Sequence, residues 1–151
     1  MSSPPDSSDA AASPDLGRPF ASTPASASVT LEDLRARMAA FVHEREWHRF
    51  HQPRNVLLAL VGEVGELAEI FQWRGEVPVG LGPSWAAADT THLGEELSDV
   101  LLYLLRLADL CSIDLPAAAL RKIEKNAAKY PAHLARGSSD KVSYSRLLEI
   151  S

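Results

Sequence analysis

Four acidic residues are the side chains best placed to do chemistry in this sequence, because they form two pairs with the same spacing. Glu63 and Glu66 make the first pair, and Glu96 and Asp99 make the second. A spacing of three residues brings both members of a pair to nearly the same face of a helix, about one turn apart. Four carboxylates brought together without a cation would repel one another, and at least one would take up a proton. Magnesium prefers oxygen ligands of this kind, so the pattern predicts a magnesium site.

Two other metal chemistries fit the same residues less well. Neither histidine nor cysteine stands at a ligand-spaced position among the four acids, which argues against zinc. A di-iron centre in a helical bundle normally uses Glu-x-x-His, whereas both pairs here end in Glu or Asp. A single acidic pair is common on a solvated helix face. Two such pairs on successive helices, flanked by aromatic residues, favour a shared site.

Aromatic side chains flank the acidic pairs. Trp47 and Trp73 stand at the ends of the first two expected helices, and His51 lies in the connector between them. Aromatic faces at these positions could stack on a nucleotide base, although a tryptophan in a small domain is more often part of the core. Tyr103 is in helical register with Asp99, which suits either a core residue or a contact with a sugar.

A basic stripe follows later in the chain. It consists of Lys122, Asn126 and Lys129, at i, i+4 and i+7. This spacing places the three side chains on one helix face, where they could bind phosphate groups. An ordinary solvated basic face explains the spacing equally well.

Helices are the elements expected to position these residues. Apolar side chains recur at helical spacing over about residues 31–46, 53–73, 90–110 and 115–130. Thr30 with Asp33 resembles a capping box, Pro53 suits a first helical turn, and Asp114 can cap the last helix. The main apolar stripe of the second helix includes Leu57, Val61 and Val64. The sequence therefore predicts an all-α four-helix bundle that buries these stripes, with a metal site between facing helices.

The two ends of the chain differ in composition from this helical part. Residues 1–29 hold five of the ten prolines and much of the serine, so we expect a disordered tail. Residues 30–136 form the expected domain, and residues 137–151 are expected to form a flexible C-terminal tail.

Composition narrows the partners and the compartment. With a net charge of −5, a nucleic-acid polymer is not expected as a partner, but a single nucleotide held through a metal ion is compatible. The single cysteine cannot form an internal disulfide, and no apolar run is long enough to cross a membrane. Residues 1–29 also lack a secretory pattern. We therefore expect an intracellular protein located in the cytoplasm, with the nucleus as the alternative.

Longer motifs around the acidic pairs resemble a known family. The two pairs are similar to the metal signature of the MazG-like, all-α nucleoside triphosphate pyrophosphatases. The stretches from His51 to Glu69, Phe71 to Trp73 and Lys129 to Arg136 resemble the dCTP pyrophosphatase branch in particular. The resemblance covers about residues 30–136. It implies that dCTP, and modified dCTP analogues, are hydrolysed to the monophosphate and pyrophosphate, as in nucleotide-pool sanitation.

The resemblance also implies roles for individual residues. Magnesium would be held by residues matching the two acidic pairs, and Glu66 is our candidate for orienting the attacking water. The nucleotide would be contacted by residues matching Trp47, His51, Trp73, Tyr103, Lys122, Asn126 and Lys129. The family further implies a homo-oligomer, a tetramer in the dCTP pyrophosphatases. Close relatives carry a histidine where this chain has Met38, a departure that bears on substrate preference.

Two other functions remain as alternatives. A dUTP or broad-specificity triphosphate pyrophosphatase would use the same metal site with a different base pocket. A non-enzymatic helical scaffold would need only amphipathic helices, but it leaves the acidic pairs, the tryptophans and the basic stripe unexplained.

Overall fold

The computed structural model describes residues 29–136, and these residues form helices joined by turns. Within that range there is no strand, so the predicted all-α class is confirmed. The elements are α1 (Leu31–Glu44), the short 3-10 helix η1 (Trp47–Arg49), α2 (Pro53–Gln72), α3 (Ala87–Leu110), α4 (Leu115–Lys129) and α5 (Ala132–Ala135). The tails predicted over residues 1–29 and 137–151 lie outside the described residues, apart from Val29.

Side-chain caps define the starts of α1 and α4 as the sequence predicts. The Thr30 hydroxyl accepts a hydrogen bond from the Asp33 N–H at 3.1 Å, and the Asp33 carboxylate accepts one from the Thr30 N–H at 2.8 Å. This reciprocal pair is the expected capping box. At α4, the Asp114 carboxylate accepts from the Ala117 N–H at 2.9 Å. Both caps pair backbone donors that a helix start otherwise leaves free.

Two helix ends differ from the predicted ones. α3 begins at Ala87, three residues before the predicted start at Thr90. The reason is a local bond in which the Asp89 carboxylate accepts from the Ala86 N–H at 3.2 Å. α1 ends at Glu44 and not at residue 46, because Glu46 adopts a left-handed conformation with φ 53°. That turn redirects the chain into η1 and then into α2.

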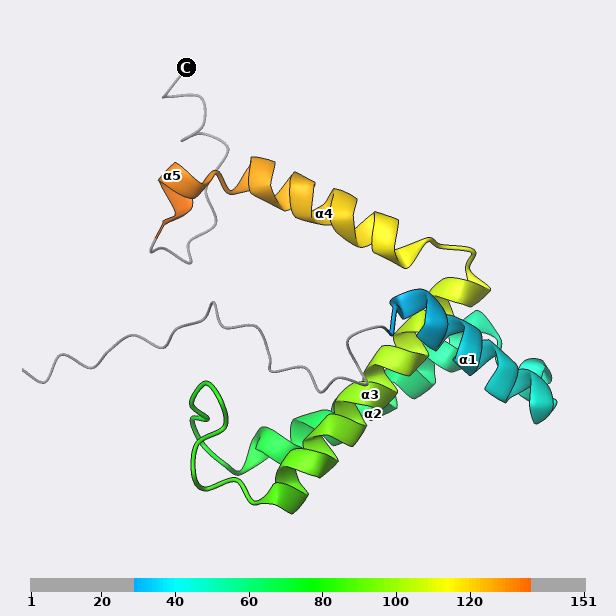
Figure 1. The fold of residues 1–151 in the computed structure, drawn as a ribbon, viewed down its shortest axis with the longest axis horizontal. Coiled ribbons are helices and arrows are strands. Elements are labelled where there is room, and N and C mark those ends of the chain that lie inside the picture. Colours follow the sequence, from blue (N-terminus) through cyan, green and yellow to red (C-terminus); the bar gives the residue numbers. More distant parts are fainter. Residues whose placement is uncertain (1–28, 137–151) are drawn as a thin grey trace, which may run out of the picture.

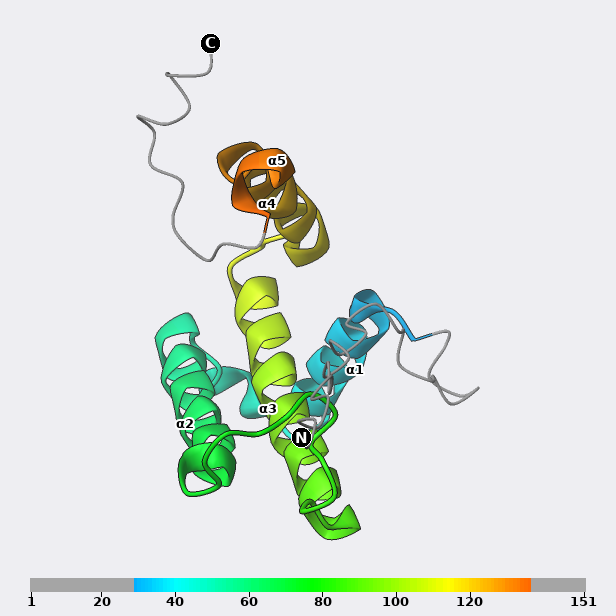
Figure 2. The ribbon, with the colours of Figure 1, turned by 90° about the vertical axis from the view of Figure 1, so that its left-hand side faces the viewer.

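Three helices form the packed part of the molecule. Figure 2 shows α3 in the middle, with α2 on one side and α1 on the other. The buried apolar residues are Val42 from α1, Val56 from α2, and Leu93 and Leu105 from α3. Since this core is small, much of the apolar surface of the three helices stays exposed. Among residues 29–136, none of the helices has the length and apolar character that a membrane span requires.

The fourth helix lies apart from the other three. Figure 1 shows α4 leaving the end of α3 and extending away from α1 and α2. Its apolar residues Leu120 and Ile123 are each 64% exposed. The four predicted helices are therefore present, but within residues 29–136 only α1, α2 and α3 pack together, and no helix of this range covers the apolar residues of α4.

The second helix turns a different face inward from the one expected. Leu57, Val61 and Val64 of its main apolar stripe are exposed. The face that packs toward α3 carries Val56, which is buried, and Glu63, which is half-buried. Periodicity identifies an apolar face correctly, but it does not say whether that face is covered by the same chain.

Candidate active site

Three of the four predicted acids meet between α2 and α3. One carboxylate oxygen from each of Glu63, Glu96 and Asp99 lies within 4.8 Å of the other two. We call these three residues the carboxylate cluster. Glu63 comes from α2, and the other two come from α3, where a spacing of three residues places them on one face. The helix pair α2–α3 therefore builds this site, as predicted.

The charges of the carboxylate cluster perturb one another. The pKa of Glu63 is raised, first by burial and then by the charges of Glu66, Asp99 and Glu96. Glu96 is buried, and its Oε2 atom has no hydrogen-bond partner among the described residues. The other oxygen, Oε1, lies 3.5 Å from His92 Nδ1. Crowded carboxylates with a buried, unpartnered oxygen are suited to a divalent cation.

Glu66 stands one turn after Glu63 and faces a separate hollow. It is exposed and lies outside the close group of three, although its charge contributes to the raised pKa of Glu63. The hollow measures about 390 Å³ and is also lined by Glu96 and Trp73. We call it the Trp73 hollow. Glu66 can therefore act beside the cluster, either on a cation or on a water molecule.

An aromatic pocket opens on the other side of Asp99, between α1 and α3. Its volume is about 400 Å³. The residues lining it are Leu34, Arg37, Met38, Phe41, Trp47, His51, Asp99, Leu102 and Tyr103. We call this the aromatic pocket. Three predicted substrate contacts, Trp47, His51 and Tyr103, therefore meet in one cavity with an acid of the cluster.

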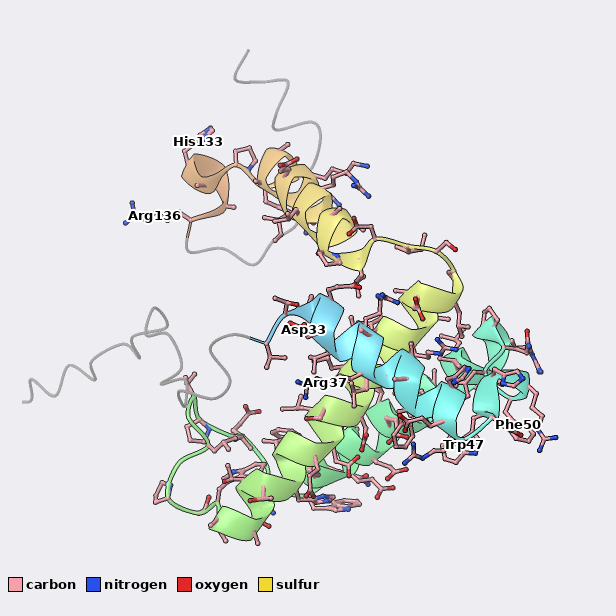
Figure 3. All side chains as sticks on the ribbon, turned by 45° about the vertical axis from the view of Figure 1, so that its right-hand side comes forward. Asp33, Arg37, Trp47, Phe50, His133 and Arg136 are labelled. Atoms are coloured by element: carbon pink, nitrogen blue, oxygen red, sulfur yellow. The ribbon has the colours of Figure 1, made fainter. Side chains whose placement is uncertain are left out.

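The turn after α1 positions the aromatic side of this pocket. Figure 3 shows Trp47 and Phe50 beyond the end of α1 that points away from α4. The Trp47 ring meets Phe41 edge-on, with centroids 5.8 Å apart, and stacks with His51 at 6.5 Å. Asn55 at the start of α2 donates from its side chain to the Phe50 carbonyl at 3.1 Å. The connector is thus held to α2, which fixes Trp47 and His51 beside the pocket.

Tyr103 links the aromatic pocket to the carboxylate cluster. It follows Asp99 by one helical turn and is half-buried. Its pKa is raised, first by burial and then by the charges of Glu63 and Asp99. The phenol therefore remains protonated near the cluster and can donate a hydrogen bond to a molecule in the pocket.

Four other predicted contacts are not brought into the aromatic pocket within one chain. Trp73 lines its own hollow and is 87% exposed, so it does not face Trp47 across a shared cavity. The other three are on α4, which extends away from α1 and α2 (Figure 1). They are Lys122, Asn126 and Lys129, all exposed.

Two polar residues near the site were not singled out from the sequence. Arg37 lines the aromatic pocket from α1, next to Met38. His92 precedes Glu96 by four residues on α3, a spacing that could have identified it. A larger hollow of about 560 Å³ lies at the start of α4, near Arg35 and Asp109, away from the carboxylate cluster.

Comparisons with known proteins agree with this arrangement. Residues 51–134 match the model of the MazG nucleotide pyrophosphohydrolase domain, a range that includes both acidic pairs. The chain belongs to this family. The MazG-like chain is therefore a nucleoside triphosphate pyrophosphohydrolase, and the family resemblance seen in the sequence is confirmed.

Relatives named dCTP pyrophosphatase 1 match most of this chain. Mouse (Mus musculus) dCTP pyrophosphatase 1 is 52% identical over 124 residues, which cover 82% of this chain and 71% of the mouse protein. The human (Homo sapiens) dCTP pyrophosphatase 1 is 57% identical over 112 residues, covering 74% and 65%. A crystal structure of a pyrophosphatase from Archaeoglobus fulgidus superposes with a TM-score of 0.54 and 34% identity, covering 67% of this chain and 92% of that one.

Proposed function

We propose that this MazG-like enzyme hydrolyses dCTP, and modified dCTP analogues, to dCMP and pyrophosphate. The observation that carries the proposal is the place of Asp99, which belongs to the carboxylate cluster and also lines the aromatic pocket. A nucleotide with its base in the pocket would therefore direct its phosphates toward the acids. The relatives' names support cytosine as the base and do not favour a dUTP or general triphosphate pyrophosphatase, nor a scaffold.

The acids would hold magnesium. Glu63, Glu96 and Asp99 offer oxygen ligands within reach of one ion, and Glu66 adds a fourth carboxylate one turn away. Bound magnesium would neutralise phosphate charge and lower the pKa of a water molecule. We assign to Glu66 the orientation of the attacking water, because this carboxylate is exposed beside the cluster and retains free lone pairs.

The aromatic pocket would hold the nucleoside. Trp47 offers a face for stacking on the base, supported by Phe41 and His51. Stacking of this kind contributes roughly 1–3 kcal/mol per base. Tyr103 lies between the base side and the acids, where its hydroxyl would contact the sugar. Met38 makes the α1 wall more apolar than a histidine would, which suits bases with an apolar substituent.

The active enzyme would be a homo-oligomer, for which we propose a tetramer. Within the described chain, the apolar faces of α2 and α4 have no helix covering them, and both would be buried between copies. The basic stripe on α4 would then reach the phosphates held by another copy. Trp73 would similarly close the nucleotide site from outside. The predicted cytoplasmic location stays a prediction.

Pyrophosphate release from a panel of nucleotides tests the activity. We expect release from dCTP with magnesium, loss of release in EDTA, and weaker release from dUTP, dTTP, dATP and dGTP. Asp99→Asn should abolish turnover with little change in folding, whereas Glu124→Gln, the same kind of change on exposed α4, should leave it intact. No release from any nucleotide, or wild-type turnover in Asp99→Asn, would refute the proposal.

Light scattering after gel filtration tests the assembly. Val61 is 60% exposed on α2, and Val79 is 68% exposed in the loop before α3. We expect Val61→Glu to reduce the mass of the particle, because a charge would be buried in the interface. Val79→Glu introduces the same charge outside the helices and should leave the mass unchanged. A monomeric wild type would contradict the oligomer.

A further inference from the structure

A network of charged residues joins α1 to α3. Asp109 on α3 receives two charge-assisted hydrogen bonds, one from Arg35 of α1 at 2.7 Å and one from Arg106 of α3 at 2.7 Å. We call these three residues the arginine–aspartate network. The Arg106 side chain is only 11% exposed, so it is nearly enclosed by the packed helices. Its terminal nitrogen is thus held, and the position of the remaining guanidinium atoms is fixed with it.

Arg106 continues the face of α3 that carries the site. Asp99, Tyr103 and Arg106 follow one another at i, i+4 and i+7, so their side chains leave the helix on the same side. Tyr103 and Asp99 line the aromatic pocket together with His51. Arg106 therefore follows Tyr103 on this face, one turn beyond the residues that line the pocket.

Two buried nitrogen atoms of His51 and Arg106 lack partners. Among the described residues, neither Arg106 Nε nor His51 Nδ1 has a hydrogen-bond partner. The Arg106 Nε atom always carries a proton and can only donate. Nδ1 of a neutral imidazole accepts when the proton is on Nε2. The two orphaned atoms are thus complementary, and leaving either unpaired in a buried place costs free energy.

The register of α2 on α3 brings the two side chains to the same region. The two helices run in opposite directions, and Glu63 meets Glu96 and Asp99 (Figure 2). The start of α2, which follows His51, therefore lies beside the part of α3 that carries Arg106. The pKa of His51 is lowered, first by burial and then by the charge of Arg106. A neutral imidazole has one donor and one acceptor, and its neighbours decide which nitrogen has which role. A guanidinium N–H beside Nδ1 favours the acceptor there.

We propose that Arg106 is a positioning residue that holds His51 with Nδ1 as an acceptor, directly or through one water, so that Nε2–H faces the aromatic pocket. His51 then presents a fixed hydrogen-bond donor beside Trp47. The nucleotide atom it binds must be an acceptor, such as a carbonyl oxygen or ring nitrogen of the base or a sugar oxygen. This inference rests on the proposed function, because it takes the aromatic pocket as the nucleoside site.

Nitrogen NMR of isotopically labelled histidine in the full chain tests the tautomer without any activity assay. Wild-type His51 should show a protonated Nε2 and an unprotonated Nδ1 at neutral pH. In Arg106→Met the preference should weaken, so that both tautomers appear. A protonated Nδ1 in the wild type, or an unchanged spectrum in Arg106→Met, would overturn the proposal.

Steady-state kinetics with dCTP separate positioning from stability. Arg106→Met should raise KM by about three- to tenfold with kcat nearly unchanged, the effect expected for one misplaced hydrogen bond. Arg35→Met is the matched control, because it removes an equivalent ion pair to Asp109 and leaves Arg106 in place. Equal KM values for the two variants would overturn the proposal.

Two further variants keep the test decisive. If Arg106→Met does not fold, Arg106→Lys retains a cation for Asp109 but lacks the Nε–H, and the same tautomer change and KM increase are expected. His51→Ala tests the proposed function separately. An unchanged KM in that variant would overturn the nucleotide contact of His51, while the wild-type spectrum would still report whether Arg106 fixes the imidazole.

Discussion

Replacing Glu63 with glutamine should stabilise the metal-free protein and destroy its response to magnesium. The carboxylate oxygens of Glu63, Glu96 and Asp99 lie within 4.8 Å of one another. At that separation, Coulomb's law gives about 0.9 kcal/mol per pair in water and about 3.5 kcal/mol at an effective dielectric constant of 20. Since Asp99 is exposed and Glu63 only half-buried, the smaller value is the better guide. Removing two such repulsions should therefore contribute about 2 kcal/mol.

Magnesium should reverse the order of stability, so that the wild type becomes more stable than Glu63→Gln. An ion present at about one hundred times its dissociation constant stabilises the folded state by about 2.7 kcal/mol. The wild type should gain that amount, whereas Glu63→Gln, which lacks one charged ligand, should gain much less. Thermal unfolding at fixed protein concentration measures both effects, and 2 kcal/mol corresponds to about 8 °C for a domain of this size. The two melting curves should therefore exchange order when EDTA is replaced by magnesium.

The pH dependence gives the same prediction a second check. The pKa of Glu63 is raised above its ordinary value of 4.5, so the folded metal-free protein binds this proton more tightly than the unfolded chain does. The charge of Glu63 therefore does not destabilise the folded wild type below that ordinary pKa. Its destabilising effect is complete once the pH exceeds the raised pKa. The advantage of Glu63→Gln in EDTA should vanish in acid and grow as the pH rises. A variant that melts at or below the wild type at neutral pH in EDTA would refute the reasoning.

Three further predictions follow from the same structure. Trp73→Ala should raise KM for dCTP by about tenfold if this exposed ring closes the nucleotide site, since one stacked base contributes roughly 1–3 kcal/mol; an unchanged KM would exclude the contact. Asp109→Ala should lower the melting temperature clearly more than Arg35→Ala, because only the first change leaves a nearly buried guanidinium without its anion; equal losses would contradict this. Glu96→Gln and Lys122→Ala should each be inactive alone, yet mixed hetero-oligomers of the two should recover part of the activity; no recovery would argue against sites shared between copies.

Local signals in the sequence predicted the helices well. The starts of α2 and α4 follow from Pro53 and Asp114, because a proline or a capping carboxylate acts on the backbone next to it. The early start of α3 depends on the hydrogen bond that the Asp89 carboxylate accepts from the Ala86 N–H. The sequence prediction did not include this bond and therefore placed the start at Thr90. The pairing of the acids was also predictable, since the two helices that carry them are joined by a single loop.

The partner of each helix face could not be predicted in the same way. Val61 and Val64 belong to an apolar stripe that periodicity identifies, yet they are exposed in the single chain. The face with Glu63 packs on α3 instead, where Glu63 meets Glu96 and Asp99. The spacing of Lys122 and Lys129 likewise predicts a shared helix face, but it does not identify what that face would contact.

The isolated position of α4 has a consequence for the newly made protein. No helix within residues 29–136 covers Leu120 and Ile123, so in the proposed oligomer a newly synthesised copy would display an apolar helix until it met another. During that interval the helix is a ready target for chaperones and for degradation. The amount of enzyme in a cell should therefore rise more steeply than its rate of synthesis, because chains that assemble quickly escape removal.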